Sequence, residues 1–506
     1  MNIKNHEHQE VKNSFWDYSA ILTSNFSLIL LSFISSTIMA RALGPKGLGT
    51  FALFQMFVGP AFIYLSAWTG SAALRYCKEE YMLENKIYRV FWARNFIMLL
   101  TGFIILPAMF SLRGFITSFM GLPAWSFWLL VAYVIIMSYY NFLEYVFQSM
   151  RLLKRYALMR SLEKLFFVTG LLLIVFNALR GDVITVVIIS MSGMLLLTLL
   201  GFISVGSGVF RPVKTDRETI TRVLRFAAPM LIGGTCTYIV NWVDVIVIKT
   251  YLSVEKVGIY SLAYQGMTVV QQVSMSAIAV LSPMIVALKV KNREDLVERY
   301  AARFVPQGMF FWVIFVSLLM PVSAALIPLI FGKAFSGTVL PFNILMIGIG
   351  ANFISSLFTP LEHAYELTRK TQKAFIAIAL INIAGDIFLI PRIGIAGAAL
   401  ATAAAFLTGF YWYGYICARR AGVSIRTPLL LSSVTILSFI LFNSGFPAAL
   451  ELAFVPILLA YSVILARYLK IFNRNDESIF EQIHMPSAVR ALAVKAYRTK
   501  LLTGDN

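Results

Sequence analysis

Residues 43–53, LGPKGLGTFAL, and residues 252–262, LSVEKVGIYSL, carry the pattern from which the fold prediction starts. Both segments begin and end in leucine, and both have a glycine preceded by an apolar residue and followed, two positions later, by an aromatic residue. The two copies lie 209 residues apart, and turns at Arg180 and Arg392 lie 212 residues apart. Recurrence at a nearly fixed, long offset predicts an internal repeat.

Apolar residues dominate the chain around these segments. Of 506 residues, 59% are hydrophobic and 13% are charged, whereas soluble proteins are about 45–50% apolar and ~25% charged. Apolar runs of ~18 or more residues recur throughout and predict roughly 14 transmembrane helices. A transmembrane β-barrel is excluded because its strands are short and alternate apolar with polar residues. We therefore predict an all-α integral membrane protein with no soluble catalytic domain.

The expected spans follow from these apolar runs. One boundary is set at Pro391-Arg392, since proline breaks helices. The spans cover residues 19–40, 48–74, 92–112, 124–149, 157–178, 183–206, 226–248, 257–288, 305–330, 338–361, 373–390, 393–417, 427–445 and 448–468.

Six spans separate the second copy of the repeat from the first. An even-numbered repeat unit places both copies in the same orientation, which is a transporter design with the substrate site between the halves. We predict two pseudo-symmetric six-helix bundles, an added helix pair and a cytoplasmic tail. Their expected bounds are 1–210, 211–421, 422–470 and 471–506.

The formal charge of +19 reflects topology in this interpretation. With the N-terminus placed in the cytoplasm, 35 of the 43 Lys and Arg residues fall on the cytoplasmic side and 8 on the other. Basic residues concentrate in cytoplasmic loops, so both termini are expected in the cytoplasm. Nucleic acid is therefore not an expected partner. The few cysteines and histidines form no metal-binding pattern, and no cofactor is expected.

Three motifs suggest a family. Residues 40–45, ARALGP, followed by Gly49, resemble the start of bacterial polysaccharide transporters, the O-antigen-type oligosaccharide flippases. Asp244 followed by residues 258–263, GIYSLA, resembles their second-half signature, and residues 390–399, IPRIGIAGAA, are a third match. These flippases belong to the multidrug/oligosaccharidyl-lipid/polysaccharide exporter superfamily. The final helix pair resembles that of some members, including peptidoglycan-precursor flippases.

The resemblance implies two six-helix bundles around a cavity that faces each side of the membrane in turn. The implied substrate is a polyprenyl-linked sugar chain, moved from the inner to the outer leaflet of the bacterial cytoplasmic (inner) membrane. The expected partners are this lipid-linked oligosaccharide and the bilayer, with the polysaccharide biosynthesis machinery as a further candidate.

Polar residues inside spans are candidates for the transport pathway, because ionisable groups are costly in a bilayer. Asn141, Glu144 and Gln148 share one helix face at spacings i, i+3 and i+7, which suits sugar hydroxyls or helix–helix hydrogen bonds. Asp244 is expected to bind a coupling cation, a sugar or a basic side chain, or to be a hydrated acid at the helix end. Gln265 is a further candidate for the pathway.

Asp386 follows Asn382 at i+4, with Arg392 further along as its expected ion-pair partner. The candidates for coupling to a cation are Asp244, Glu144 and Asp386.

Arginines at the cytoplasmic ends of spans are candidates for binding a diphosphate, because the guanidinium fork matches phosphate oxygens. The alternative is ordinary anchoring at the membrane surface. Arg75 is the preferred residue. The other members of this expected basic vestibule are Lys78, Arg94, Lys164 and Arg225.

The main prediction is a non-enzymatic flippase that moves a polyprenyl-diphosphate-linked oligosaccharide by alternating access. One alternative is a cation-coupled exporter of drugs or small solutes from the same superfamily. A membrane-embedded polysaccharide polymerase or ligase is less favoured, because the short outer loops carry no carboxylate pair or His-rich segment.

Overall fold

The computed structural model describes residues 2–206, 216–445, 451 and 453–472. These residues form helices joined by short connections. The predicted tail, 471–506, lies almost entirely outside the described residues. The described chain divides into two compact units, Met1–Val245 with Ser253–Gly258, and Ile246–Leu252 with Ile259–Asn506. The predicted bundle boundaries at 210 and 421 stay predictions.

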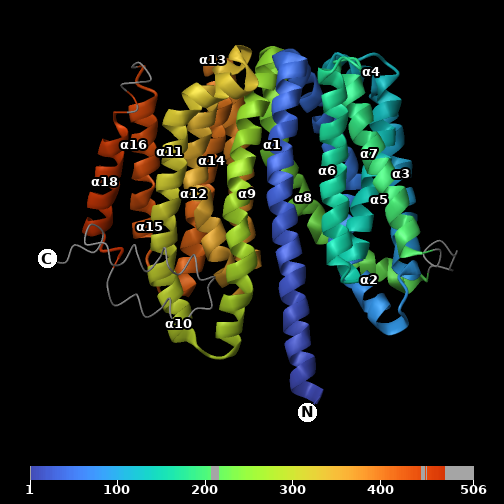
Figure 1. Ribbon diagram of the computed structural model, residues 1–506, viewed down its shortest axis with the longest axis horizontal. Helices are drawn as coiled ribbons and strands as arrows, with labels where there is room; N and C mark the ends of the chain where they lie inside the picture. Colours follow the sequence, from blue (N-terminus) through green and yellow to red (C-terminus); the bar gives the residue numbers. More distant parts are fainter. Residues whose placement is uncertain (1, 207–215, 446–450, 452, 473–506) are drawn as a thin grey trace. The chain divides into compact units, whose positions relative to one another are not determined.

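Unit 1 is built around α1, which packs against α3, α5, α6 and α7, while α2 packs against α5. Figure 1 shows α3 to α7 gathered in this unit. Its helices are α1 (Asn2–Leu65), the 3-10 turn η1 (Ala67–Thr69), α2 (Gly70–Glu84), α3 (Tyr88–Ser111), α4 (Arg113–Met120), α5 (Ser126–Ser149), α6 (Leu153–Val175), α7 (Val183–Val205) and α8 (Arg217–Tyr251) as far as Val245.

In unit 2, α14 packs against α12 and α13, and α11 packs against α12. The first member of the predicted additional helix pair consists of α15 and α16, and the second member is α18. Both members lie beside α11 (Figure 1). The helices of unit 2 are α9 (Val254–Val290) after its first turn, α10 (Glu294–Arg299), the π-helical turn η3 (Tyr300–Phe304), α11 (Val305–Phe331), η4 (Lys333–Thr338), α12 (Val339–Ala364), α13 (Thr368–Ile393), α14 (Ile395–Arg420), α15 (Arg426–Leu431), α16 (Ser433–Phe442) and α18 (Val455–Tyr468).

Ten helices in the described part of the chain are long and apolar enough to cross a membrane. The first, Asn25–Leu65, holds two expected spans, since Gly44 interrupts it with φ 66° and ψ −177°. Helix α6 carries charged residues in its first half, and two shorter apolar helices, Arg426–Phe442 and Val455–Tyr468, follow α14. The predicted all-α, multi-pass membrane fold with roughly 14 spans is confirmed at this level.

Two expected boundaries were wrong. The span at 48–74 is broken, because α1 ends at Leu65 and α2 begins at Gly70 after a 3-10 turn. Hydropathy cannot detect this break, since the residues around it are small or apolar. The boundary at Pro391-Arg392 was also misplaced: α13 continues to Ile393, and the chain turns at Gly394 with φ 65°. Proline here occupies the last helical turn and does not end the helix.

The backbone itself repeats. Five residues with positive φ in the first half have counterparts in the second half at offsets of 207 to 217 residues, whereas Gly44 has none among the described residues. Such residues fix the angle at which a chain leaves a helix. The repeat inferred from residues 43–53 therefore extends to five successive helix connections. The pairs are Asn85 and Asn292, Gly121 and Gly332, Arg151 and Glu366, Asn177 and Gly394, and Gly206 and Gly422.

The two copies of the sequence motif cross each other within unit 1. A methyl group added to Gly49 would lie 2.0 Å from the carbonyl oxygen of Val254, and one added to Gly258 would lie 1.9 Å from that of Pro45. Gly49 and Gly258 are 209 residues apart, and so are their contact partners, Pro45 and Val254. The two contacts are therefore equivalent under the repeat. We call this contact the glycine crossing.

Candidate functional site: an arginine pocket between α2 and α8

Two helix segments of unit 1 present arginines to the same space. Arg75 and Glu79 are one turn apart on α2. Helix α8 begins where the backbone N–H of Thr219 donates to Asp216 Oδ1 at 2.9 Å, which caps the helix. Hydrogen bonds from Thr219 hold the pKa of this carboxyl below its usual range, so the cap is lost only as the pH falls through that lowered pKa.

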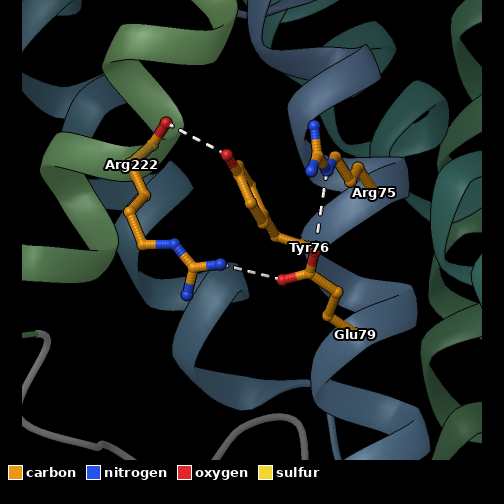
Figure 2. Close-up of polar contacts among 4 residues, drawn as sticks. All are labelled: Arg75, Tyr76, Glu79 and Arg222. Carbon is orange, nitrogen blue, oxygen red and sulfur yellow. Dashed lines mark hydrogen bonds and ion pairs between the residues drawn. The ribbon is translucent and has the colours of Figure 1, made fainter.

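Glu79 lies between two arginines from different helices. Figure 2 shows its carboxylate between the guanidinium groups of Arg75 and Arg222. Arg75 Nε lies 3.5 Å from Glu79 Oε1, and Arg222 Nη2 lies 2.9 Å from Glu79 Oε2. The side chain of Arg75 is 56% exposed, that of Arg222 is 54% exposed and that of Glu79 is 42% exposed. These ion pairs are therefore solvated.

Aromatic rings support the arginines. The rings of Tyr76 and Phe226 pack edge to face with centroids 5.9 Å apart. The Arg75 guanidinium lies 5.2 Å from the Phe226 centroid, and that of Arg222 lies 4.9 Å from the Tyr76 centroid. The Tyr76 hydroxyl also donates to the carbonyl oxygen of Arg222 at 3.4 Å (Figure 2). Stacking on rings orients a guanidinium while leaving its N–H groups available.

An open cavity of about 850 Å³ lies at this place and is called the arginine pocket below. A cavity of this volume is within the range for ligands of drug size. Four arginines line it with one acid, and Glu79 adjoins them, which favours an anionic ligand. The lining residues are Arg75, Tyr76, Arg217, Glu218, Thr221, Arg222, Arg225 and Phe226.

The structure brings two of the predicted site residues, Arg75 and Arg225, together in this pocket. Sequence reasoning did not select Arg222, Glu79 or Tyr76 as site residues. Two signals could have found Glu79 and Arg222: the i, i+4 spacing of Arg75 and Glu79, and the i, i+3 spacing of Arg222 and Arg225. The pairing between α2 and α8 has no such signal, because 143 residues separate Glu79 from Arg222.

Arg94 was wrongly placed in the basic vestibule. Its side chain is 1% exposed. Its Nη2 donates to Ser66 Oγ and, at 3.1 Å, to the carbonyl oxygen of Ser138 on α5, and the guanidinium lies 4.6 Å from the Phe142 centroid. Because Ser66 is the residue at which α1 gives way to η1, Arg94 connects the break in the second span to α5.

The predicted polar stripe on α5 is held by the neighbouring helix. Asn141 Nδ2 donates to Glu144 Oε2 at 3.3 Å, and Arg160 Nε on α6 lies 3.3 Å from Glu144 Oε1. Gln148 is half-buried one turn further on. The expected shared helix face is therefore present for Asn141 and Glu144, and the acid has a basic partner. This geometry is that of an interhelical contact, and a role in sugar binding stays a prediction.

The remaining candidates lie on other helices. Asp244 on α8 is fully buried, and its Oδ1 accepts from the backbone N–H of Val245 at 2.9 Å. Gln265 on α9 is half-buried. Asp386 on α13 is fully buried. None of the three lines the arginine pocket.

The expected ion pair between Asp386 and Arg392 was wrong, because the Arg392 guanidinium lies at Phe388. Arg392 Nη1 donates to the carbonyl oxygen of Phe388 at 2.5 Å, and the guanidinium lies over the ring of Phe388. Asn382, one turn before Asp386, donates to Thr402 Oγ1 on α14 at 3.1 Å. Across the described part of the chain, no three His, Cys, Asp or Glu residues gather as metal ligands would.

Residues 12–289 match the model of a family described as polysaccharide biosynthesis protein. The chain belongs to this family. The match covers more than half of the sequence, and it confirms the resemblance that the motifs around Gly49 and Asp244 suggested. It also includes every residue that lines the arginine pocket.

Individual proteins resemble this family member along most of its length. A probable low-salt glycan biosynthesis flippase from Haloferax volcanii, Agl15, is 21% identical over 380 residues, which is 74% of this chain and 77% of that one. Lipid II flippase MurJ in an inward closed conformation has a TM-score of 0.67 at 15% identity and covers 89% of this chain and 99% of its own.

An inward-facing multidrug transporter of the MATE family, in the MOP superfamily, has a TM-score of 0.61 at 13% identity and covers 78% of this chain and 94% of its own. The family member therefore has the fold of these transporters, and the proteins to which it is similar are flippases and a multidrug transporter.

Proposed function

We propose that the protein moves a polyprenyl-diphosphate-linked oligosaccharide from the inner to the outer leaflet by alternating access. The observation that carries the proposal is the arginine pocket, which joins four arginines to two aromatic rings. Arginine binds phosphate bidentately, and rings beside it suit the apolar faces of a sugar. The motif resemblance and the family described above support a lipid-linked glycan as the class of substrate.

The membrane arrangement of the proposal follows from charge. We place the protein in a bacterial cytoplasmic membrane with both termini in the cytoplasm, because 35 of 43 Lys and Arg residues then face the cytoplasm. Arg75 and Arg225 would receive the diphosphate there. Outward movement of two negative charges is favoured by about 4.6 kcal/mol per 100 mV, inside negative. A membrane potential of this sign could thus drive net export.

The test uses purified protein in liposomes that contain a fluorescent polyprenyl-diphosphate oligosaccharide in both leaflets. A membrane-impermeant quencher reports its movement with and without an imposed potential. We expect flipping that depends on the potential. Replacing Arg75 or Arg225 by alanine should slow it about 5-fold each, as expected for losing ~1 kcal/mol of charge interaction in a solvated pocket.

Arg113→Ala is the control, because Arg113 lies on α4 outside the pocket lining. The proposal is contradicted if the wild type flips no polyprenyl-linked sugar. Ion-driven efflux of small cations by the same preparation would favour the exporter alternative, and a change in the glycan's covalent structure would favour a polymerase or ligase.

Coupling to a cation is a second element of the proposal. Asp244 and Asp386 are fully buried acids in spans, and such groups are retained for ion pathways or partners. We expect Asp244→Asn and Asp386→Asn to abolish any stimulation by an imposed Na⁺ or proton gradient. Glu144→Gln should have a smaller effect because Glu144 is paired with Arg160. Equal stimulation in the wild type and all three variants would remove these acids from the mechanism.

A further inference from the structure

We propose that Glu79 is an internal counter-anion that keeps the arginine pocket closed to singly charged lipid headgroups and yields to a diphosphate. The inference rests on the proposed function, since it assigns a selectivity to the same pocket. It concerns the affinity that an anion needs in order to occupy the pocket, and it makes Glu79 a residue that lowers the apparent affinity of every anion.

The geometry places Glu79 where a ligand phosphate would bind. Each of its two carboxylate oxygens faces a different arginine, with Arg75 at 3.5 Å and Arg222 at 2.9 Å. Both arginines line the pocket, and both are held against aromatic rings. An anion that enters the pocket must therefore compete with a carboxylate already present, whose effective concentration is high because it is part of α2.

The competition is weak enough to be overcome. All three side chains are about half exposed, and solvated ion pairs contribute only ~0.2–1 kcal/mol each. The two pairs lower the fraction of time during which the arginines are free of Glu79. The apparent affinity of every incoming anion falls in proportion to that fraction. A diphosphate retains enough affinity, since it offers two phosphates to the arginine forks. A phosphodiester with a single charge does not.

Glu79 lowers the apparent affinities of a diphosphate and of a phosphodiester by the same factor. It therefore raises the intrinsic affinity that any anion needs in order to bind, and it leaves the ratio of the two affinities unchanged. Its consequence depends on concentration. The cytoplasmic leaflet of a membrane carries anionic lipids, which would compete with a lipid-linked glycan for the pocket. Lowering both affinities by one factor reduces occupancy by either anion, but it moves the headgroups from saturating to sub-saturating concentrations, so they inhibit binding of the diphosphate less.

The chain offers a matched control. Glu218 lines the same pocket, and none of the ion pairs identified in the described residues includes it. Glu79→Gln and Glu218→Gln each remove one negative charge. Only Glu79→Gln also removes the bridge between the two arginines.

The experiment measures binding of inorganic pyrophosphate and of dimethyl phosphate to the purified full-length protein. It also measures flipping in liposomes with increasing phosphatidylglycerol. We expect Glu79→Gln to tighten both soluble anions about 5-fold, and Glu218→Gln to tighten them by about 2-fold or less. Phosphatidylglycerol should inhibit flipping by Glu79→Gln at about 5-fold lower content than it inhibits flipping by the wild type. Glu79→Asp, which is too short to reach both arginines, should lie between the wild type and Glu79→Gln.

The results separate the two proposals. Equal affinities in the wild type and in the Glu79 variants, or equal sensitivity of the wild type and Glu79→Gln to phosphatidylglycerol, overturn the counter-anion while Arg75-dependent flipping still stands. If neither the wild type nor Glu79→Gln binds pyrophosphate or flips the substrate, the proposed function fails first. If Glu79→Gln cannot be purified folded, Glu79→Asp alone decides, and wild-type affinity in that variant overturns the inference.

Discussion

Replacing Gly258 by alanine is expected to prevent the protein from folding stably. The added methyl group would lie 1.9 Å from the carbonyl oxygen of Pro45 and 2.8 Å from the backbone nitrogen of Gly49. Both are backbone atoms that cannot rotate away, so the crossing segments would have to separate. We expect a loss on the order of 3 kcal/mol in the free energy of unfolding, seen as a lower thermal midpoint and a smaller yield of monodisperse protein.

Gly49→Ala should have the same effect, because its methyl group would lie 2.0 Å from the carbonyl oxygen of Val254. Gly233→Ala is the matched control. It is also a helical glycine, but nothing lies within 4 Å of its added methyl group, so alanine should be neutral or stabilise by up to ~1 kcal/mol. A Gly258→Ala protein that melts with the wild type would show that the crossing is not as close as described.

Removing the Arg94 side chain is the second substitution with a large expected effect. Arg94→Ala would leave a cavity and would deprive Ser66 and the Ser138 carbonyl of their donor. Large-to-small changes at buried sites cost about 2–5 kcal/mol. We expect a loss of ~3 kcal/mol by thermal unfolding, together with loss of transport, since the break at Ser66 would no longer be fixed to α5.

Two further variants separate the contribution of the side-chain volume of Arg94 to stability from the contribution of its hydrogen bonds. Arg94→Met keeps most of the volume and removes the charge, so it should cost about half as much as Arg94→Ala. Arg94→Lys keeps the charge but lacks the planar fork that reaches both oxygens, and it should remain clearly destabilised. Arg180→Ala, at an exposed position, should stay within about 0.5 kcal/mol of the wild type. A stable Arg94→Ala protein would contradict the bridging role.

Sequence alone predicted the helices well, because a span needs only a run of apolar residues, and such runs are visible without a structure. It also predicted the turn between residues 43 and 48, since glycine and proline are local signals. It did not predict the break at Ser66. The residues from Ala67 to Ala73 remain small or apolar there, and what fixes the break is a hydrogen bond from Arg94 on a later helix.

The same limit applies to the candidate site. Arg75 and Arg225 were chosen because basic residues at span ends are a local pattern. The predicted role of Arg94 in the vestibule was wrong, because the burial of a side chain depends on which helices pack together. The Glu79–Arg222 pair could not be inferred, because it joins segments that are far apart in the sequence. Asp386 and Arg392 illustrate the converse: suitable spacing along one helix did not make an ion pair, because Arg392 bonds to Phe388.

The glycine crossing has a consequence for the ancestry of the chain. Gly49 meets Val254, and Gly258 meets Pro45, so each copy of the motif uses the same two positions to contact the other. This is the isologous pattern of a two-fold homodimer. A protein with a single copy would be complementary to itself, and we expect such an ancestor to be a parallel dimer. Fusion made its assembly independent of protein concentration and freed each copy to change alone.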